Sequence, residues 1–367
     1  MKGPARYCVV FHFHQPPYDD ETMGYYDECY EQSYGTHLDA LDAAPGVKVN
    51  YNMTGILLET IKQNNPQFID RLGEKVGSGQ VYLTACGYTH PIFPIILERL
   101  GKDACKIQIE RDLEIKEKLF GVEPKILRLP EYAVSDDVVY LLQEFGFTGT
   151  IIPDFVFHEK GIDTKHVLER LGLRMAARNN YLSTALAGGE YEKYKNYFKW
   201  MKDYGGTPEE VADDFTKKLL SAESILTDFD GECYNHWVIA HGIPIDKRNI
   251  LETVYKTILD KGIEMLHLPE FMDSAPTEEV DEIPRVSYDK EKVLSLWEGE
   301  PKHDGMWADI ERCWDMYLGS GDEGVLDLAL KSQTSCWTWA VTHNYPQWWL
   351  EQAGRYREMI EGMVNVG

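Results

Sequence analysis

Two carboxylates are the residues best suited to do chemistry, and each follows directly after an apolar stretch. Glu131 comes after the short run 126–129 and a proline, and Asp230 ends the stretch 224–230. Two carboxylates at the mouth of a barrel, with aromatic residues around them, suit cleavage of a glycosidic bond. One attacks the anomeric carbon and the other, its pKa raised by burial and by its neighbour, protonates the leaving oxygen. We predict that Glu131 is the nucleophile and Asp230 the acid/base.

Each carboxylate also has a simpler interpretation. A helical pattern follows Glu131, so its negative charge could do no more than stabilise the positive N-terminal end of that helix. Asp230 precedes Gly231, and aspartate is common in tight turns. Neither residue alone therefore decides in favour of an enzyme.

The order of elements predicts an α/β fold. Apolar or alternating segments indicate strands, and amphipathic patterns closed by glycines indicate helices between them. Such alternation with short turns is typical of a parallel sheet or barrel. Acidic residues, proline and serine accumulate from about 269 to 285, and helical patterns follow. We expect a catalytic barrel over 1–272 and a helical domain over 273–367. The expected strands are 7–14, 47–54, 81–86, 126–129, 148–152, 224–230 and 264–268.

Polar side chains gather at four of the expected strand ends. In a parallel barrel all carboxyl ends face one side, so these side chains would converge on a single cleft. The histidines favour sugar binding over metal binding, because no third or fourth ligand is obvious nearby. Tryptophans would supply platforms for sugar rings. Besides the two carboxylates, the predicted site contains His12, His14, His90, Arg128, Glu232, His236, Trp237, Trp337 and Trp339.

Composition narrows the class of partner. The 367 residues include 61 acidic and 37 basic side chains, which gives a net charge of −24. That balance repels nucleic acid and anionic lipid but is compatible with a neutral sugar. No apolar run reaches the length of a membrane span. Seven cysteines without a Cys-x-x-Cys pair, and no signal peptide, predict reduced thiols and a cytoplasmic protein. The sequence does not indicate an oligomeric state.

Four segments together resemble glycoside hydrolase family 57, which contains α-amylases, 4-α-glucanotransferases and glucan-branching enzymes. The resemblance implies an incomplete (β/α)7 barrel with a helical region closing over the cleft. It also implies a retaining mechanism on α-glucans without cofactor or metal, with Glu131 as nucleophile and Asp230 as acid/base. The segments are Phe-His-Phe-His-Gln-Pro-Pro-Tyr (11–18), Gly-Gln-Val-Tyr-Leu-Thr-Ala-Cys-Gly-Tyr-Thr-His-Pro-Ile-Phe-Pro (79–94), Leu-Pro-Glu-Tyr-Ala (129–133) and Phe-Asp-Gly-Glu-Cys-Tyr-Asn-His-Trp (229–237).

Two positions depart from the family pattern. Arg128 stands where an aromatic residue is usual, and Tyr82 stands where the family carries a glutamate. Arg128 would lower the pKa of Glu131 and could recognise an anionic or differently shaped sugar. The chain is also short for a branching enzyme. The exact glycan, and hydrolysis against transfer, therefore stay open.

Two other functions remain as alternatives. A metal-dependent barrel hydrolase on another glycan would use His12 and His14 as ligands. A carbohydrate-binding homologue would keep the pocket without turnover.

Overall fold

The computed structural model describes residues 4–17, 23–186, 207–234, 249–291, 293–343 and 345–366. Its first sheet has the strand order β3-β2-β1-β7, and β8 pairs with the amino-terminal half of β1. Every pairing in this sheet is parallel, so the carboxyl ends of its strands lie on one side. The strands are β1 (Arg6–Phe13), β2 (Val49–Met53), β3 (Val81–Thr84), β7 (Ser224–Asp230) and β8 (Glu264–Met265).

The second sheet has the order β4-β6-β5-β9. Strand β4 pairs parallel with β6, whereas β5 and β6 form an antiparallel pair. These strands are β4 (Gly149–Pro153), β5 (Val167–Arg170), β6 (Leu173–Arg178) and β9 (Thr277–Glu279).

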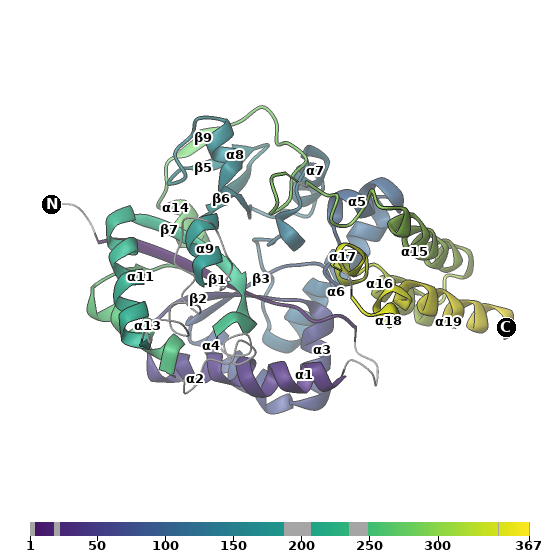
Figure 1. Cartoon of the computed structure of the whole chain (residues 1–367), viewed down its shortest axis with the longest axis horizontal. Coiled ribbons are helices and arrows are strands. Elements are labelled where there is room, and N and C mark those ends of the chain that lie inside the picture. The colour runs from purple at the N-terminus through teal and green to yellow at the C-terminus, as the bar shows by residue number, and fades with distance from the viewer. Residues whose placement is uncertain are drawn as a thin grey trace.

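The segment 126–127 joins the two sheets into one curved wall. Parallel bridges link Ala85 with Leu127 and Ile126 with Gly149. At the opposite seam the Asn179 N–H donates to the Leu226 carbonyl over 2.9 Å, and no ladder pairs β6 with β7 in the described part of the chain. Seven parallel segments, in the order β3, β2, β1, β7, β6, β4 and 126–127, thus enclose one interior. The expected incomplete (β/α)7 barrel is confirmed (Figure 1).

Helices cover the outside of this wall. Their starts follow from local sequence: Thr207 and Glu210 form a reciprocal capping box on α11, and the Ser135 side chain caps α7. The larger helices of the barrel are α2 (Gly35–Ala43), α3 (Gly55–Asn64), α4 (Pro66–Gly77), α6 (Lys102–Phe120), α7 (Asp136–Glu144), α11 (Pro208–Ala222) and α13 (Asn249–Asp260). Shorter elements are α1 (Met23–Cys29), η1 (Tyr30–Tyr34), α5 (Phe93–Arg99), η2 (Pro130–Tyr132), α8 (Asp154–Glu159), α9 (Asn180–Leu186), η3 (Gly231–Tyr234) and α14 (Leu268–Asp273).

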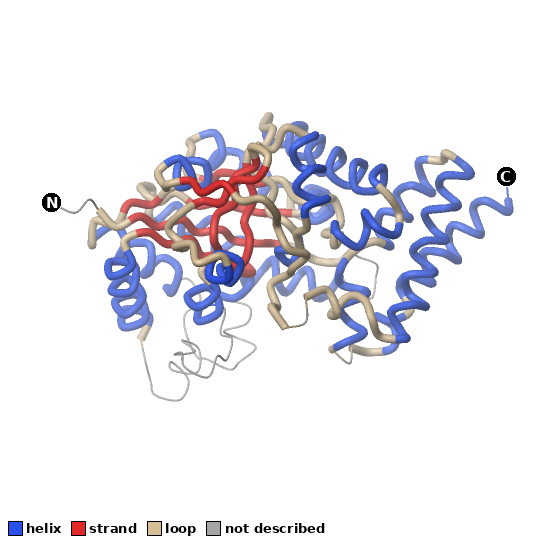
Figure 2. The backbone as a smooth tube through the Cα atoms, turned by 90° about the horizontal axis from the view of Figure 1, so that it is seen from above, coloured by secondary structure: helices blue, strands red, loops and turns tan. Residues whose placement is uncertain are grey.

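The carboxy-terminal region is helical, as expected. Figure 2 shows these helices grouped beyond one end of the strands, on the side away from the amino terminus. They are α15 (Pro301–Ser320), α16 (Glu323–Ser332), α17 (Ser335–Thr342), α18 (Gln347–Leu350) and α19 (Gln352–Val366).

One predicted strand was too long. The segment 264–268 is extended only at Glu264–Met265, because His267 already precedes α14 and Pro269 occupies its first turn. Helix α14 then places Leu268, Phe271 and Met272 in the apolar cluster of the barrel interior. It closes the end of the barrel opposite to the carboxyl ends of the strands.

Candidate active site

Alternation along the strands decides which side chains enter the barrel. Cys8 and Val10 of β1 lie in the interior apolar cluster, so His12 continues the same face beyond them. Leu226 of β7 belongs to that cluster too, and Asp228 and Asp230 follow it at period two. The ladder pairs His12 with Asp230, which sets the two side by side at the carboxyl end of the barrel.

The same reasoning applies to the neighbouring segments. Ile126 and Ala176 lie in the interior cluster, so Arg128 and Arg178 stand on the inner face two residues later. Tyr82 lies lower in the barrel, since it pairs with Asn50, the partner of Val10. The level above the apolar cluster is therefore polar and charged.

Glu131 sits on a strained turn. Its φ is 55° and that of Tyr132 is 53°, the left-handed region that side chains other than glycine rarely adopt. The Tyr288 N–H donates to the Glu131 carbonyl over 2.9 Å and holds this conformation. Strain of this kind costs roughly 1–3 kcal/mol per residue and concentrates at functional sites. The Glu131 side chain keeps 27% exposure, whereas Pro130 and Tyr132 beside it are buried.

Three histidines stack next to this turn. The ring of His90 lies 4.6 Å from that of His12 and 4.5 Å from that of His14, measured between centroids. His90 Nδ1 is 3.9 Å from Glu131 Oε1. Burial lowers the pKa of all three imidazoles, that of His14 to about 3, and the positive charge of Arg128 adds to the shift. At neutral pH each ring is therefore an uncharged hydrogen-bonding group.

Each histidine is fixed by a polar partner. His12 Nδ1 lies 2.7 Å from Asn52 Oδ1, and His14 Nδ1 lies 3.1 Å from Thr54 Oγ1. The partner of the third histidine comes from the carboxy-terminal helices: Ser335 Oγ lies 2.8 Å from His90 Nδ1. Thr334 Oγ1 and Cys336 Sγ lie 3.2 and 3.4 Å from His14 Nε2. The barrel and the helical region thus meet at the histidines.

Both carboxyl groups of the predicted pair are shifted toward their protonated forms. Burial raises the pKa of Glu131 to about 7; Arg128 opposes this rise and Asp230 adds to it. Burial likewise raises the pKa of Asp230, and Arg128 again opposes it. The two groups therefore act on one another, and the arginines supply the opposing charge that favours ionisation.

Glu232 points into a different environment from the one predicted for a sugar contact. Its side chain is buried, and its Oε1 accepts hydrogen bonds from Gln15 Nε2 at 3.2 Å and from the Tyr34 hydroxyl at 2.8 Å. Burial raises its pKa to about 8, with Asp230 contributing to the rise. In this structure Glu232 ties the turn after β7 to η1.

The residue between these two carboxyls has to be glycine. A Cβ on Gly231 would lie 2.0 Å from the ring of Phe13, which is itself enclosed by Tyr34, Tyr51 and His37. The Gly231 carbonyl accepts from Ser33 Oγ at 3.0 Å. The turn that carries Asp230 is therefore packed with no spare room.

We expect Gly231→Ala to lower the free energy of unfolding by about 1–3 kcal/mol, because the added methyl group overpacks this contact. It should also lower activity, since Asp230 moves with the turn. Denaturant unfolding and glucan turnover measure the two effects. Gly305→Ala in α15, where a Cβ would meet nothing within 4 Å, is the control and should keep or raise stability. Equal stability of both variants would contradict the tight packing at Gly231.

The two tryptophans predicted as platforms lie in different surroundings. Trp337 is fully buried, with its indole N–H on the Lys331 carbonyl and its ring against Trp349, so no face is open to a sugar. Trp339 is half-buried and interacts with the hydroxyl of Tyr288, which itself feels the charges of Glu131 and Asp230. Tyr288 is a site residue that the sequence did not single out.

Arg128 is not placed as a substrate contact. Its guanidinium donates from Nε to Asp228 Oδ2 over 3.1 Å, and only 3% of the residue is exposed. The predicted recognition of an anionic sugar by Arg128 therefore finds no accessible group. His236 and Trp237, also predicted site residues, lie outside the described residues.

Other features of the described chain bear on the remaining predictions. No group of three or more His, Cys, Asp or Glu side chains in the described ranges is arranged to hold a metal ion. None of the described helices has the length and apolarity needed to cross a bilayer.

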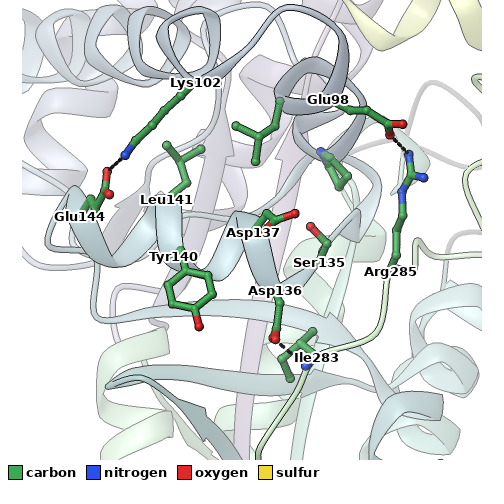
Figure 3. A pocket seen from close by; sticks show the side chains of 12 residues that line it. Glu98, Lys102, Ser135, Asp136, Asp137, Tyr140, Leu141, Glu144, Ile283 and Arg285 are labelled. Atoms are coloured by element: carbon green, nitrogen blue, oxygen red, sulfur yellow. Dashed lines mark hydrogen bonds and ion pairs between the residues drawn. The ribbon is translucent and has the colours of Figure 1, made fainter.

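A surface hollow of about 650 Å³ lies between α5, α7 and the segment 283–285 (Figure 3). None of the predicted site residues lines it. Four of its charged groups are paired with one another, Lys102 with Glu144 and Arg285 with Glu98. The catalytic candidates are thus found at the strand ends and not in this hollow.

Comparison with known families agrees with this geometry. The model of glycosyl hydrolase family 57 matches residues 8–284, which is most of the chain. The chain belongs to this family. All four segments singled out in the sequence lie within the matched range.

The relatives carry different activities in their names. A 4-α-glucanotransferase of Thermococcus litoralis is 29% identical over 142 residues, covering 39% of this chain and 21% of that protein. An α-amylase of Pyrococcus abyssi is 30% identical over 138 residues, covering 37% and 20%. The matched part of the chain thus spans about a fifth of the length of each of these relatives.

A solved structure supports the fold over the whole chain. A GH57-type branching enzyme from Pyrococcus horikoshii superposes with a TM-score of 0.76 at 16% identity. The superposition covers 98% of this chain and 88% of that one. It includes the carboxy-terminal helices, which lie beyond the residues that the family model matches.

Proposed function

We propose that the chain is a retaining enzyme on α-glucans, with Glu131 as nucleophile and Asp230 as acid/base. The observation that carries this proposal is that both carboxyl groups stand beside the stacked histidines: Asp230 pairs with His12 in the ladder, and Glu131 Oε1 lies 3.9 Å from His90 Nδ1. The two carboxylates lie 99 positions apart in the sequence (230 − 131). Membership in the family and the names of the relatives support the same activity.

The proposed chemistry starts with Glu131 ionised and Asp230 protonated. Ionised Glu131 attacks the anomeric carbon while Asp230 gives its proton to the leaving glycosidic oxygen. Asp230, now a carboxylate, then takes a proton from the incoming hydroxyl, whose oxygen displaces Glu131 from the sugar. Water as the second nucleophile gives hydrolysis, and a sugar hydroxyl gives transfer.

The surrounding residues suit an uncharged substrate. Three neutral imidazoles can donate to and accept from sugar hydroxyls without the cost of burying a charge. Tyr288 and the half-exposed Trp339 offer aromatic surface beside the carboxyls. We assign the sugar at the cleavage point to the space between these two groups of side chains.

The helical region takes part in this site. Thr334, Ser335 and Cys336 reach His14 and His90 from the junction of α16 and α17. These contacts support a helical region that closes over the cleft, while β9 (Thr277–Glu279) still pairs with β5 and so belongs with the barrel.

Incubation with maltoheptaose tests the proposal. Shorter maltooligosaccharides alone indicate hydrolysis, and a ladder that includes longer products indicates transfer. The products are separated by chromatography, and Glu131→Gln protein prepared in the same way is the control for contaminating amylase. Binding of maltoheptaose without any product would contradict turnover and favour a carbohydrate-binding protein.

A further inference from the structure

Arg128 is a buried cation enclosed by groups of this chain. Its Nε donates to Asp228 Oδ2 over 3.1 Å, and its Nη1 donates to the Leu129 carbonyl over 3.3 Å. Its guanidinium carbon lies 4.3 Å from the ring centre of Tyr132. Both Arg128 and Asp228 are almost completely buried.

A second cation reaches the same aromatic ring. The guanidinium carbon of Arg178 lies 4.9 Å from the ring centre of Tyr132, and its Nε donates to the Asp228 carbonyl over 2.8 Å. The Tyr132 hydroxyl donates to that carbonyl as well, over 3.2 Å. Tyr132, the residue after Glu131, is thus fastened to β7 and contacted by two guanidinium groups. Such contacts between cations and rings strengthen when water is excluded.

This arrangement compensates for the strained turn. Glu131 and Tyr132 both adopt left-handed φ angles, and such angles persist only when the surroundings hold them. Tyr132 cannot leave this conformation without losing its hydroxyl bond and both cation contacts. A turn held in this way aims the Glu131 carboxylate at one place, which a nucleophile requires.

We propose that Arg128 is a positioning residue for Glu131, acting through Tyr132 and Asp228, and that its positive charge favours the ionised form of the Glu131 carboxylate. This inference rests on the proposed function, since it takes Glu131 as the nucleophile. It assigns to Arg128 an electrostatic task within the protein in place of recognition of an anionic sugar.

The charges around Glu131 support this reading. Burial is the largest influence on the pKa of Glu131, and Arg128 is the next and opposes it. Asp228, the partner of Arg128, has the opposite and a smaller influence. The other titratable or charged groups that face Glu131 are Asp230, Arg178, His90, Tyr288 and Cys336.

The test removes the charge of Arg128 and follows the pH dependence of kcat/KM. Arg128→Met removes the cation and keeps much of the side-chain volume, so the acid limb of kcat/KM on maltoheptaose should move upward by about one pH unit or more. Activity at pH 6 should then fall roughly tenfold further than activity at pH 8. Arg128→Lys should restore part of the shift. Arg111→Met is the matched control, since Arg111 likewise lies over a tyrosine ring and pairs with an aspartate, Asp327.

A second variant and a direct titration keep the outcome decisive. Arg128→Met with Asp228→Asn removes both buried charges, so it avoids an unpaired carboxylate if the single variant unfolds. Carbon-13 NMR, with Glu131→Gln for assignment, measures the pKa of Glu131 without any turnover. An upward shift in the folded double variant supports the inference even if the wild type cleaves no glucan. An unshifted Glu131 pKa, or a higher KM with an unchanged pH profile, would overturn it.

Discussion

Replacing Glu131 with glutamine should lower kcat/KM on maltoheptaose by roughly 1,000-fold or more. Glutamine keeps the shape of the side chain but cannot form the covalent bond to the anomeric carbon. The fold should persist, because the backbone bond from Tyr288 to the Glu131 carbonyl does not involve the side chain. Initial rates, circular dichroism and maltoheptaose binding measure the three quantities.

A variant with a smaller side chain tests from which face of the sugar ring Glu131 acts. In Glu131→Gly, azide can occupy the vacated space and attack α-maltosyl fluoride directly, which gives β-maltosyl azide. Glu117→Gln on the exposed side of α6 is the control and should keep full activity. Formation of the α-azide, or unimpaired turnover by Glu131→Gln, would show that Glu131 is not the nucleophile.

Replacing Asp230 with asparagine should lower turnover of maltoheptaose by roughly 100- to 10,000-fold, the usual contribution of a general acid/base. The rate of the first step on α-maltosyl fluoride should fall far less, because fluoride leaves without needing a proton. The ratio of the rate loss on maltoheptaose to the rate loss on α-maltosyl fluoride is therefore the diagnostic quantity. Stopped-flow or steady-state release of fluoride, beside glucan cleavage, measures it.

Azide distinguishes this residue from Glu131 by the opposite stereochemistry. In Asp230→Ala, azide should intercept the sugar already bound to Glu131 and give α-maltosyl azide, the product with retained configuration. Asp315→Asn, an exposed position on α15, is the control. Equal losses on the glucan and on the fluoride would speak against Asp230 as the acid.

The strand ends were predictable because their signals are local. A near-continuous apolar run that stops at a histidine pair indicates a strand of a parallel sheet, and β1 lies there. The same holds for β7 and Asp230, where the strand and its final carboxylate fall within seven residues. All carboxyl ends of a parallel barrel face one side, so His12 and Asp230 were expected in one cleft, whereas their direct pairing in the ladder was not predicted.

The rest depended on contacts that no local pattern records. Tyr288 reaches Glu131 through a backbone bond across a long separation, and its own neighbourhood in sequence has no strand or helix signal. The partner of Arg128 is Asp228, a hundred positions later, and only the curved wall of strands brings them together. The sequence therefore suggested a substrate contact for Arg128 where the fold provides an internal ion pair.

The region between the two catalytic segments was the least predictable. The antiparallel pair of β5 and β6 falls in the stretch from 161 onward, which showed no clear periodicity. Strand β9, from beyond the expected domain boundary, pairs with β5 and adds a long-range contact. Trp337 looked like a platform because tryptophans are dense around it, but its indole N–H is satisfied internally and its ring fills the helical core.

The contacts of Thr334 and Ser335 with the histidines also set an order of assembly during translation. His14 is synthesised long before its partner Thr334, which follows 320 positions later. Both proposed catalytic carboxylates also precede Thr334 in the chain, so they can be present while the imidazoles of His14 and His90 still lack their partners. Synthesis of the segment 334–336 thus completes the contacts of these imidazoles after the strands of the barrel have been made.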